Sequence, residues 1–207
     1  MATVTDSREQ STATQSSTVP AHRLTVDRYL QMVEADIFKE NEPIFLWNGR
    51  LAEKMTKGDD HSYTLSELYA MLLGLIPTGW CIRQEQPIRI SDHGMPEPDL
   101  TVLRGKNRDY RRGRTPTSQD VALLIEVADS SLAFDSGEVL ETFARESIPI
   151  YWIVNLPNRR VEAYSEPTGP SDWPSYRERR FYVAGERVPV VLDGRQVGPI
   201  DVSEILP

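Results

Sequence analysis

Apolar positions recur at two different spacings along this chain, and together they predict a protein built from both helices and strands. Helical spacing occurs in residues 24–37, where Thr25 is a candidate N-cap, and in residues 60–76, whose apolar side includes Leu68 and Leu73. Shorter apolar or alternating runs predict strands at 80–90, 98–105, 121–128, 149–155, 159–164, 177–183 and 188–192.

The connections between these segments predict a mixed α/β domain. Asn48-Gly49 separates two apolar runs, which indicates a tight hairpin because both residues tolerate positive φ. A helix predicted at 136–146 lies between two strands, so we expect a β-α-β unit with parallel strands. Residues 22–207 are predicted to form one domain, preceded by a polar, disordered tail over residues 1–21.

Composition narrows the class of protein. A hydrophobic content of 39% with four Trp supports a real core, and Cys81, the single cysteine, cannot form an internal disulfide. No apolar stretch approaches the ~20 residues that cross a bilayer, and no secretory signal is visible, so we expect a cytoplasmic protein without membrane contact. The net charge of −8 argues against non-specific coating of nucleic acid but leaves a local basic patch open.

Two acidic residues interrupt predicted strands. In strand 121–128, alternation places Val121 with Leu123, Ile125 and Val127 on one face, and Ala122 with Leu124, Glu126 and Ala128 on the other. In PEPDLTVLR, Asp99 falls on the face opposite Leu100 and Val102. Two strand carboxylates of this kind indicate a site for a hard cation such as Mg²⁺. The alternative is a pair of structural salt bridges to nearby Arg residues.

Several motifs in a fixed order resemble the Uma2 family, also called DUF820. The motifs are GRLAEKM, a helix opened by His61, EPDLTVLRG, LLIEVADSSLAFDSGE and IPIYWIVNL. The resemblance runs from about residue 25 to the C-terminus. It implies a restriction endonuclease-like fold of the PD-(D/E)XK superfamily, with a mixed central sheet flanked by helices and an N-terminal helix and hairpin. It also implies cleavage of DNA with Mg²⁺, for which Mn²⁺ can substitute, and it leaves a homodimer open.

The resemblance assigns roles to particular residues. Asp99 matches the Asp of the PD motif and Glu126 the acid of the (D/E)XK motif, so both would bind the metal. Glu53 matches a further acid that could complete the metal shell and take part in catalysis. His61 matches a family histidine, for which helix capping or local hydrogen bonding is an equal alternative.

The chain departs from the family pattern at the lysine. The superfamily usually carries it two residues after the acid, where this chain has Ala128. Uma2-like sequences commonly carry it four residues after an Asp on the next helix. Here that Asp is Asp135, and Val139 occupies the lysine position.

Three interpretations of the missing lysine follow. The protein could be an inactive nuclease fold that binds DNA or protein, or metal-bound water could suffice for slow turnover. Alternatively, another cation could substitute, and the candidates are Lys54, Lys57 and Arg145. Beside an active nuclease and an inactive nuclease fold, a third hypothesis for the whole protein is a domain unrelated to nucleic acids, whose strand acids only form salt bridges.

A basic loop follows the Asp99 strand. Residues 104–114 contain six basic side chains and one acid, and Tyr110 among them could stack on a base or sugar. Arginine suits bidentate phosphate binding, so we expect contacts with DNA from Arg108, Arg111, Arg112 and Arg114. A solvated surface loop is the alternative.

Overall fold

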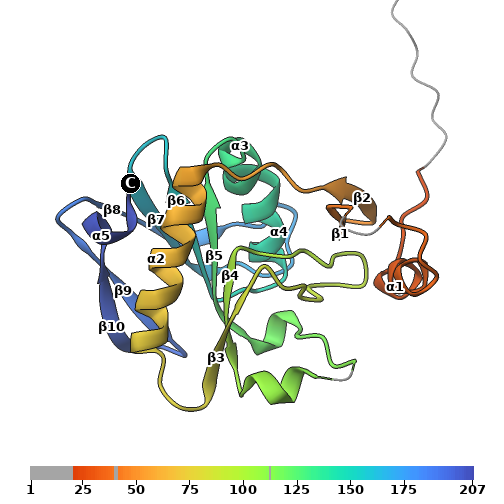
Figure 1. Cartoon of the computed structure of the whole chain (residues 1–207), viewed down its shortest axis with the longest axis horizontal. Helices are drawn as coiled ribbons and strands as arrows, with labels where there is room; N and C mark the ends of the chain where they lie inside the picture. Colours follow the sequence, from red (N-terminus) through yellow and green to blue (C-terminus); the bar gives the residue numbers. More distant parts are fainter. Residues whose placement is uncertain (1–20, 40–41, 112) are drawn as a thin grey trace, which may run out of the picture.

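A six-stranded mixed sheet forms the centre of the fold in the computed structural model, which describes residues 21–39, 42–111 and 113–207 (Figure 1). The predicted tail, apart from Ala21, and Arg112 lie outside the described residues. The strands are β3 (Trp80–Gln84), β4 (Leu100–Arg104), β5 (Val121–Ala128), β6 (Ile150–Asn155), β7 (Arg160–Pro167) and β8 (Tyr176–Val183), in that order across the sheet. The predicted mixed α/β architecture is confirmed.

The only parallel pair among these described strands is β5 with β6, as the β-α-β prediction requires. The connection between them is helical, and consists of α3 (Leu132–Phe134), a π-helical turn (Asp135–Val139) and α4 (Leu140–Arg145). The helical segment begins at Leu132 rather than at the predicted residue 136.

Both faces of the sheet are covered. One face packs against α2 (Asp59–Leu75), the hairpin of β9 (Arg187–Leu192) and β10 (Arg195–Asp201), and α5 (Val202–Ile205). The other face packs against the α3–α4 segment, with the hairpin of β1 (Ile44–Trp47) and β2 (Arg50–Glu53) at its side (Figure 1). A strand enclosed on both sides must be apolar on both, which explains the composition of β5.

A β-bulge changes the predicted alternation at the start of β5. Val102 pairs with Leu123 and Leu103 with Val121, so Ala122 is an extra residue in the ladder. Val121 therefore joins the core on the α4 side, and Ala122 joins the core on the α2 side. From Leu123 onward the predicted faces hold, which leaves Glu126 on the α4 side.

The N-terminal elements follow their local signals. Thr25 caps α1 (Val26–Glu34) by accepting a hydrogen bond from the Arg28 N–H at 3.3 Å. Asn48 and Gly49 form the hairpin turn with φ of +46° and +79°. These predictions are confirmed.

Two local predictions were wrong, and two elements were not predicted. Leu73 is 56% exposed instead of facing the core. The strand predicted over 80–90 ends at Gln84, and β10 with α5 was not predicted at all.

Among the described residues, no helix combines the length and apolar character needed to cross a membrane.

A buried carboxylate anchors the β6–β8 side of the sheet. Glu162 is 1% exposed and accepts hydrogen bonds from Tyr164 at 2.7 Å, Asn155 at 2.8 Å, Arg160 at 2.7 Å and Arg179 at 2.6 Å. Burial raises the pKa of Glu162, but these four donors outweigh it and lower the pKa to about 2.

We expect Glu162→Gln to lower the free energy of unfolding by about 3 kcal/mol at pH 7, because it removes the carboxylate of a buried ion pair while its arginines stay in place. The pKa is depressed in the folded protein, so this contribution is present above the unfolded value of 4.5 and fades as pH falls toward 2. Urea unfolding at pH 7 and pH 3 measures both effects. The exposed Glu178→Gln on β8 is the control, and an equal loss at both pH values contradicts the assignment.

Candidate active site

Asp99 and Glu126 are held together by a reciprocal exchange between β4 and β5. The Asp99 N–H donates to Glu126 Oε2 at 3.1 Å, and the Val127 N–H donates to Asp99 Oδ2 at 2.8 Å. The antiparallel register, in which Leu100 faces Ile125, brings the start of β4 against Glu126. The two predicted strand acids therefore meet at one point.

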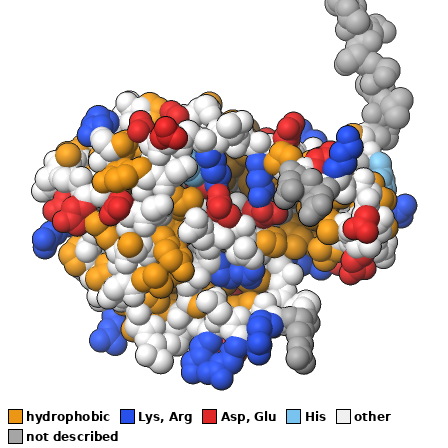
Figure 2. All heavy atoms as spheres, viewed as in Figure 1, with side chains coloured by type: hydrophobic (Ala, Val, Ile, Leu, Met, Phe, Trp, Pro, Cys, Tyr) orange, Lys and Arg blue, Asp and Glu red, His pale blue; other side chains and the backbone are white. Residues whose placement is uncertain are grey.

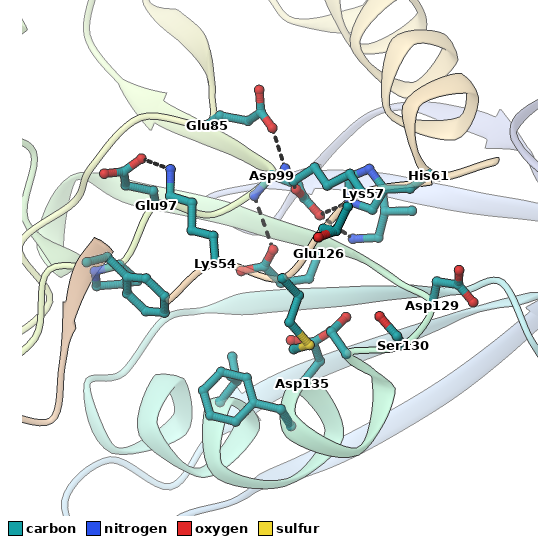
Figure 3. A pocket seen from close by; sticks show the side chains of 18 of the residues that line it. Lys54, Lys57, His61, Glu85, Glu97, Asp99, Glu126, Asp129, Ser130 and Asp135 are labelled. Carbon is teal, nitrogen blue, oxygen red and sulfur yellow. Dashed lines mark hydrogen bonds and ion pairs between the residues drawn. The ribbon is translucent and has the colours of Figure 1, made fainter. Parts of the chain in front are cut away.

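Asp99 is 5% exposed, and its carboxylate pairs with Lys57 and accepts a hydrogen bond from His61. Lys57 Nζ lies 2.6 Å from Asp99 Oδ1 and also pairs with Glu85, while His61 Nε2 donates to Asp99 Oδ2 at 3.0 Å (Figure 3). Burial raises the pKa of Asp99, but the His61 hydrogen bond and the Lys57 charge outweigh it, so the pKa is lowered. The same pairing raises the pKa of Lys57 despite its burial. Both groups are ionised at neutral pH.

Lys57 reaches the site from the loop between β2 and α2, and Glu85 helps to fix it there. Glu85 has a φ of +52°, a left-handed conformation that non-glycine residues adopt rarely. Its N–H is bonded to the carbonyls of Pro98 and Asp99, which holds this turn against the start of β4. Such backbone conformations are concentrated at functional sites.

The surroundings of Glu126 do not balance the charge that its ionised form would carry. The hydrogen bond that the structure shows for its side chain comes from the Asp99 N–H. Burial, followed by the negative charges of Asp99 and Asp135, raises the pKa of Glu126 well above its ordinary range, and Lys57 opposes this only in part. A bound cation would relieve this excess of negative charge.

Asp135 supplies a third carboxylate from the helical segment. It is 6% exposed, lies in the π-helical turn and accepts a hydrogen bond from Ser131 Oγ at 2.5 Å. Burial and the charge of Asp99 raise its pKa to about 6, although the Ser131 bond opposes them. Single π-turns of this kind are frequent at functional sites because they redirect side chains within a helix.

These groups form one side of a cleft that encloses about 860 Å³, including its open mouth. Charged groups of both signs line it, as Figure 3 shows for Lys54, Lys57, Glu97 and Asp135. In the space-filling view, acidic and basic side chains lie side by side over the hollow between α2 and the β1–β2 hairpin (Figure 2). Apolar side chains also line the cleft, and they include Phe45, Met55, Phe134 and Val139.

Val139, which stands at the expected lysine position, lines this cleft and is 3% exposed. Of the substitutes considered from the sequence, Lys57 contacts Asp99, Lys54 lines the cleft but pairs with Glu97, and Arg145 is not among the lining residues. The positive charge beside the metal-ligand candidates therefore comes from the loop before α2.

The structure does not bring Glu53 to the cleft. Its side chain is exposed on β2, and its neighbours Ala52 and Lys54 are directed inward, as alternation requires. The expected contribution of Glu53 to a metal shell therefore has no geometric support.

The basic loop lies at the opposite end of β4 from Asp99, at the lower edge of the view in Figure 1. Arg108, Arg111 and Arg114 are exposed. Tyr110 is not free to stack as expected, because Arg114 covers its ring at 5.1 Å and its hydroxyl donates to the Arg104 carbonyl. The loop is thus outside the cleft.

Several cleft residues were missed by sequence reasoning. Glu85 lies outside the quoted motifs, Glu97 and Ser131 lie within them without an assigned role, and Phe45 and Phe134 looked like ordinary apolar positions. The one sequence signal that could have indicated any of these cleft residues is a polar residue directly after the end of a strand, and it applies only to Glu85.

The chemistry of the donors fits a hard divalent cation. Asp99 and Glu126 offer carboxylate oxygens, which Mg²⁺ prefers, and the raised pKa of Glu126 marks an unbalanced negative charge. In the part of the chain that the structure describes, no cluster of three or more His, Cys, Asp or Glu has a metal-binding arrangement, and Asp99 is engaged by Lys57 and His61 instead.

Comparison with protein families decides the relationship that the motifs suggested. The model of the Uma2 family, described as "Putative restriction endonuclease", matches residues 26–202. The chain belongs to the Uma2 family. The predicted resemblance is therefore confirmed.

A solved structure supports the Uma2 fold. It is a crystal structure from Anabaena variabilis ATCC 29413, described as "a putative nuclease belonging to DUF820", with a TM-score of 0.63 and 16% sequence identity. The match covers 88% of this Uma2 chain and 97% of the other chain. At this identity the similarity concerns the fold alone. No curated protein matches the chain.

We expect Asp135→Asn to stabilise the protein by about 3 kcal/mol at pH 8 and hardly at pH 3. The folded pKa of about 6 lies above the unfolded value of 3.8, so ionised Asp135 destabilises the fold, and this cost fades as pH falls from 6 to below 3.8. Urea unfolding at both pH values tests it. Asp129→Asn, at an exposed cleft residue, is the matched control, and equal stabilisation at both pH values would refute the assignment.

Proposed function

We propose that this Uma2 protein hydrolyses phosphodiester bonds in DNA, with Asp99 and Glu126 holding Mg²⁺ or Mn²⁺ and Lys57 supplying the positive charge that Val139 cannot. The observation that carries the proposal is the Lys57 ammonium, 2.6 Å from Asp99 inside the cleft. Family membership and the nuclease-like fold support the reaction class.

The two carboxylates and the Lys57 ammonium have different roles in the proposed reaction. Asp99 and Glu126 present their carboxylates at the end of two strands, held by backbone N–H groups that keep them in place. A divalent cation bound there would polarise the scissile phosphate and lower the pKa of the attacking water. Lys57 donates hydrogen bonds to that water or to a phosphate oxygen, and it stabilises the negative charge that develops in the transition state.

Lys57 fits this role better than the other cations considered. Its side chain is 32% exposed, so it can leave Glu85 and turn toward a substrate without losing contact with Asp99. Asp135, with a pKa of about 6, is suited to accept or return a proton near neutral pH.

A second candidate function is an inactive nuclease fold that binds DNA or protein. The observation in its favour is that both oxygens of Asp99 already have partners, Lys57 on Oδ1 and His61 with the Val127 N–H on Oδ2. In that case the carboxylates serve as structural ion pairs. Activity and metal binding distinguish the two functions.

We expect cleavage of supercoiled plasmid with Mg²⁺ or Mn²⁺ to fall by roughly 10²–10⁴-fold in Lys57→Ala, because a positioned charge is lost from the transition state. Glu126→Gln should also abolish it. Titration with Mn²⁺ should show that Lys57→Ala binds metal at least as tightly as the native protein, since a competitor for Asp99 has been removed.

Lys54→Ala is the matched control, because it removes the same side chain from the same loop but from a pair with Glu97. Its effect on cleavage should stay below tenfold. Native protein that neither cleaves DNA nor binds metal would favour the inactive alternative.

Val139→Lys should restore cleavage at least tenfold in the Lys57→Ala background, because position 139 lines the same cleft. Val139→Met, of similar length but uncharged, should not. The plasmid assay measures both. Cleavage by Val139→Lys alone, with none by the native protein, would instead indicate a scaffold inactivated at this position.

A further inference from the structure

The apolar wall of the cleft is formed by side chains from three separate segments. Phe45 comes from β1, Met55 from the loop after β2, and Phe134 from α3. Met55 is 46% exposed and both phenylalanines are half-buried, so all three present surface to the cleft.

Trp47 braces the two phenyl rings from behind. Its ring centroid lies 6.3 Å from that of Phe45 and 5.4 Å from that of Phe134, both in edge-on geometry. Trp47 itself is 3% exposed, and its indole N–H donates to Glu138 at 2.8 Å. The wall is therefore held in position before any ligand arrives.

The hydrolysis of a phosphodiester does not require such a wall. The phosphate and the sugar are polar, and the carboxylates with Lys57 already provide for them. A rigid aromatic surface beside a charged floor fits a ligand that is itself part anion and part flat ring. A nucleotide has this composition, and stacking on aromatic side chains is how proteins hold unpaired bases.

We infer that the wall formed by Phe45, Met55 and Phe134 binds an unpaired nucleobase next to the phosphate to be cut, so the substrate is single-stranded or locally unpaired DNA. The inference rests on the proposed phosphodiester hydrolysis. In an intact duplex the bases are stacked and paired, so a duplex offers this wall nothing to stack upon.

Binding is measured on Glu126→Gln protein, which does not cut, by anisotropy of a fluorescein-labelled single strand of thymidines and of a duplex of equal length. The single strand should bind at least tenfold more tightly. Adding Phe134→Ala should weaken single-strand binding by roughly 5- to 100-fold and duplex binding less than twofold. Adding Phe134→Leu, which keeps an apolar side chain without the ring, should weaken it by a smaller factor.

Phe181→Ala is the matched control, because Phe181 is an exposed phenylalanine on β8, 46% exposed and outside the cleft. It should leave single-strand affinity unchanged. A 2-aminopurine base within the strand should lose fluorescence on binding, and Phe134→Ala should abolish that loss. Urea unfolding confirms that each variant is folded.

The outcomes separate this inference from the proposed function. Native cleavage of duplex and single strand at equal rates, unaffected by Phe134→Ala, would overturn the base-binding wall and leave the nuclease standing. Single-strand binding that depends on Phe134, without cleavage of any DNA, would keep the wall and remove the nuclease. Equal affinity for the two DNAs, or no binding of either, overturns the wall.

Discussion

The candidate site depends on the exchange of hydrogen bonds between β4 and β5. Asp99 and Glu126 each accept a bond from a backbone N–H of the other strand, so two like charges are held together by groups that cannot rotate away. The register of an antiparallel ladder fixes such positions more firmly than side-chain contacts do. The floor of the cleft is consequently as rigid as the sheet itself.

The rest of the site follows from the charge that this exchange concentrates. Lys57 and His61 hold Asp99 in its ionised form, whereas burial and neighbouring carboxylates raise the pKa values of Glu126 and Asp135. A cation bound beside these two acids would stabilise their ionised forms. The lysine beside Asp99 belongs to the loop before α2, whereas the helix position at Val139 is apolar and buried.

Two kinds of surface line the cleft, one charged and one aromatic, and they come from different elements of the fold. The sheet and α2 provide charge, whereas the β1–β2 hairpin and α3 provide aromatic surface, with Trp47 linking the two phenylalanines. Glu162 lies two strands from Glu126 in the same row of the sheet, through Ile153, but four donors balance its charge completely. The two buried acids differ because Glu162 has four donors, which lower its pKa, whereas Glu126 has one backbone donor and a raised pKa.

The sequence by itself determined most of the secondary structure, because caps, Asn-Gly turns and alternation act over a few residues. Through its motifs it also indicated the family and the pairing of Asp99 with Glu126. Only the tertiary structure decided which cation lies beside Asp99, since Lys57 and Asp99 are 42 residues apart and meet through the path of a loop. It likewise excluded Glu53 from the cleft and moved the basic loop to the far end of β4. The bulge at Ala122 and the aromatic wall had the same origin: they depend on how distant strands and side chains pack, which no local pattern encodes.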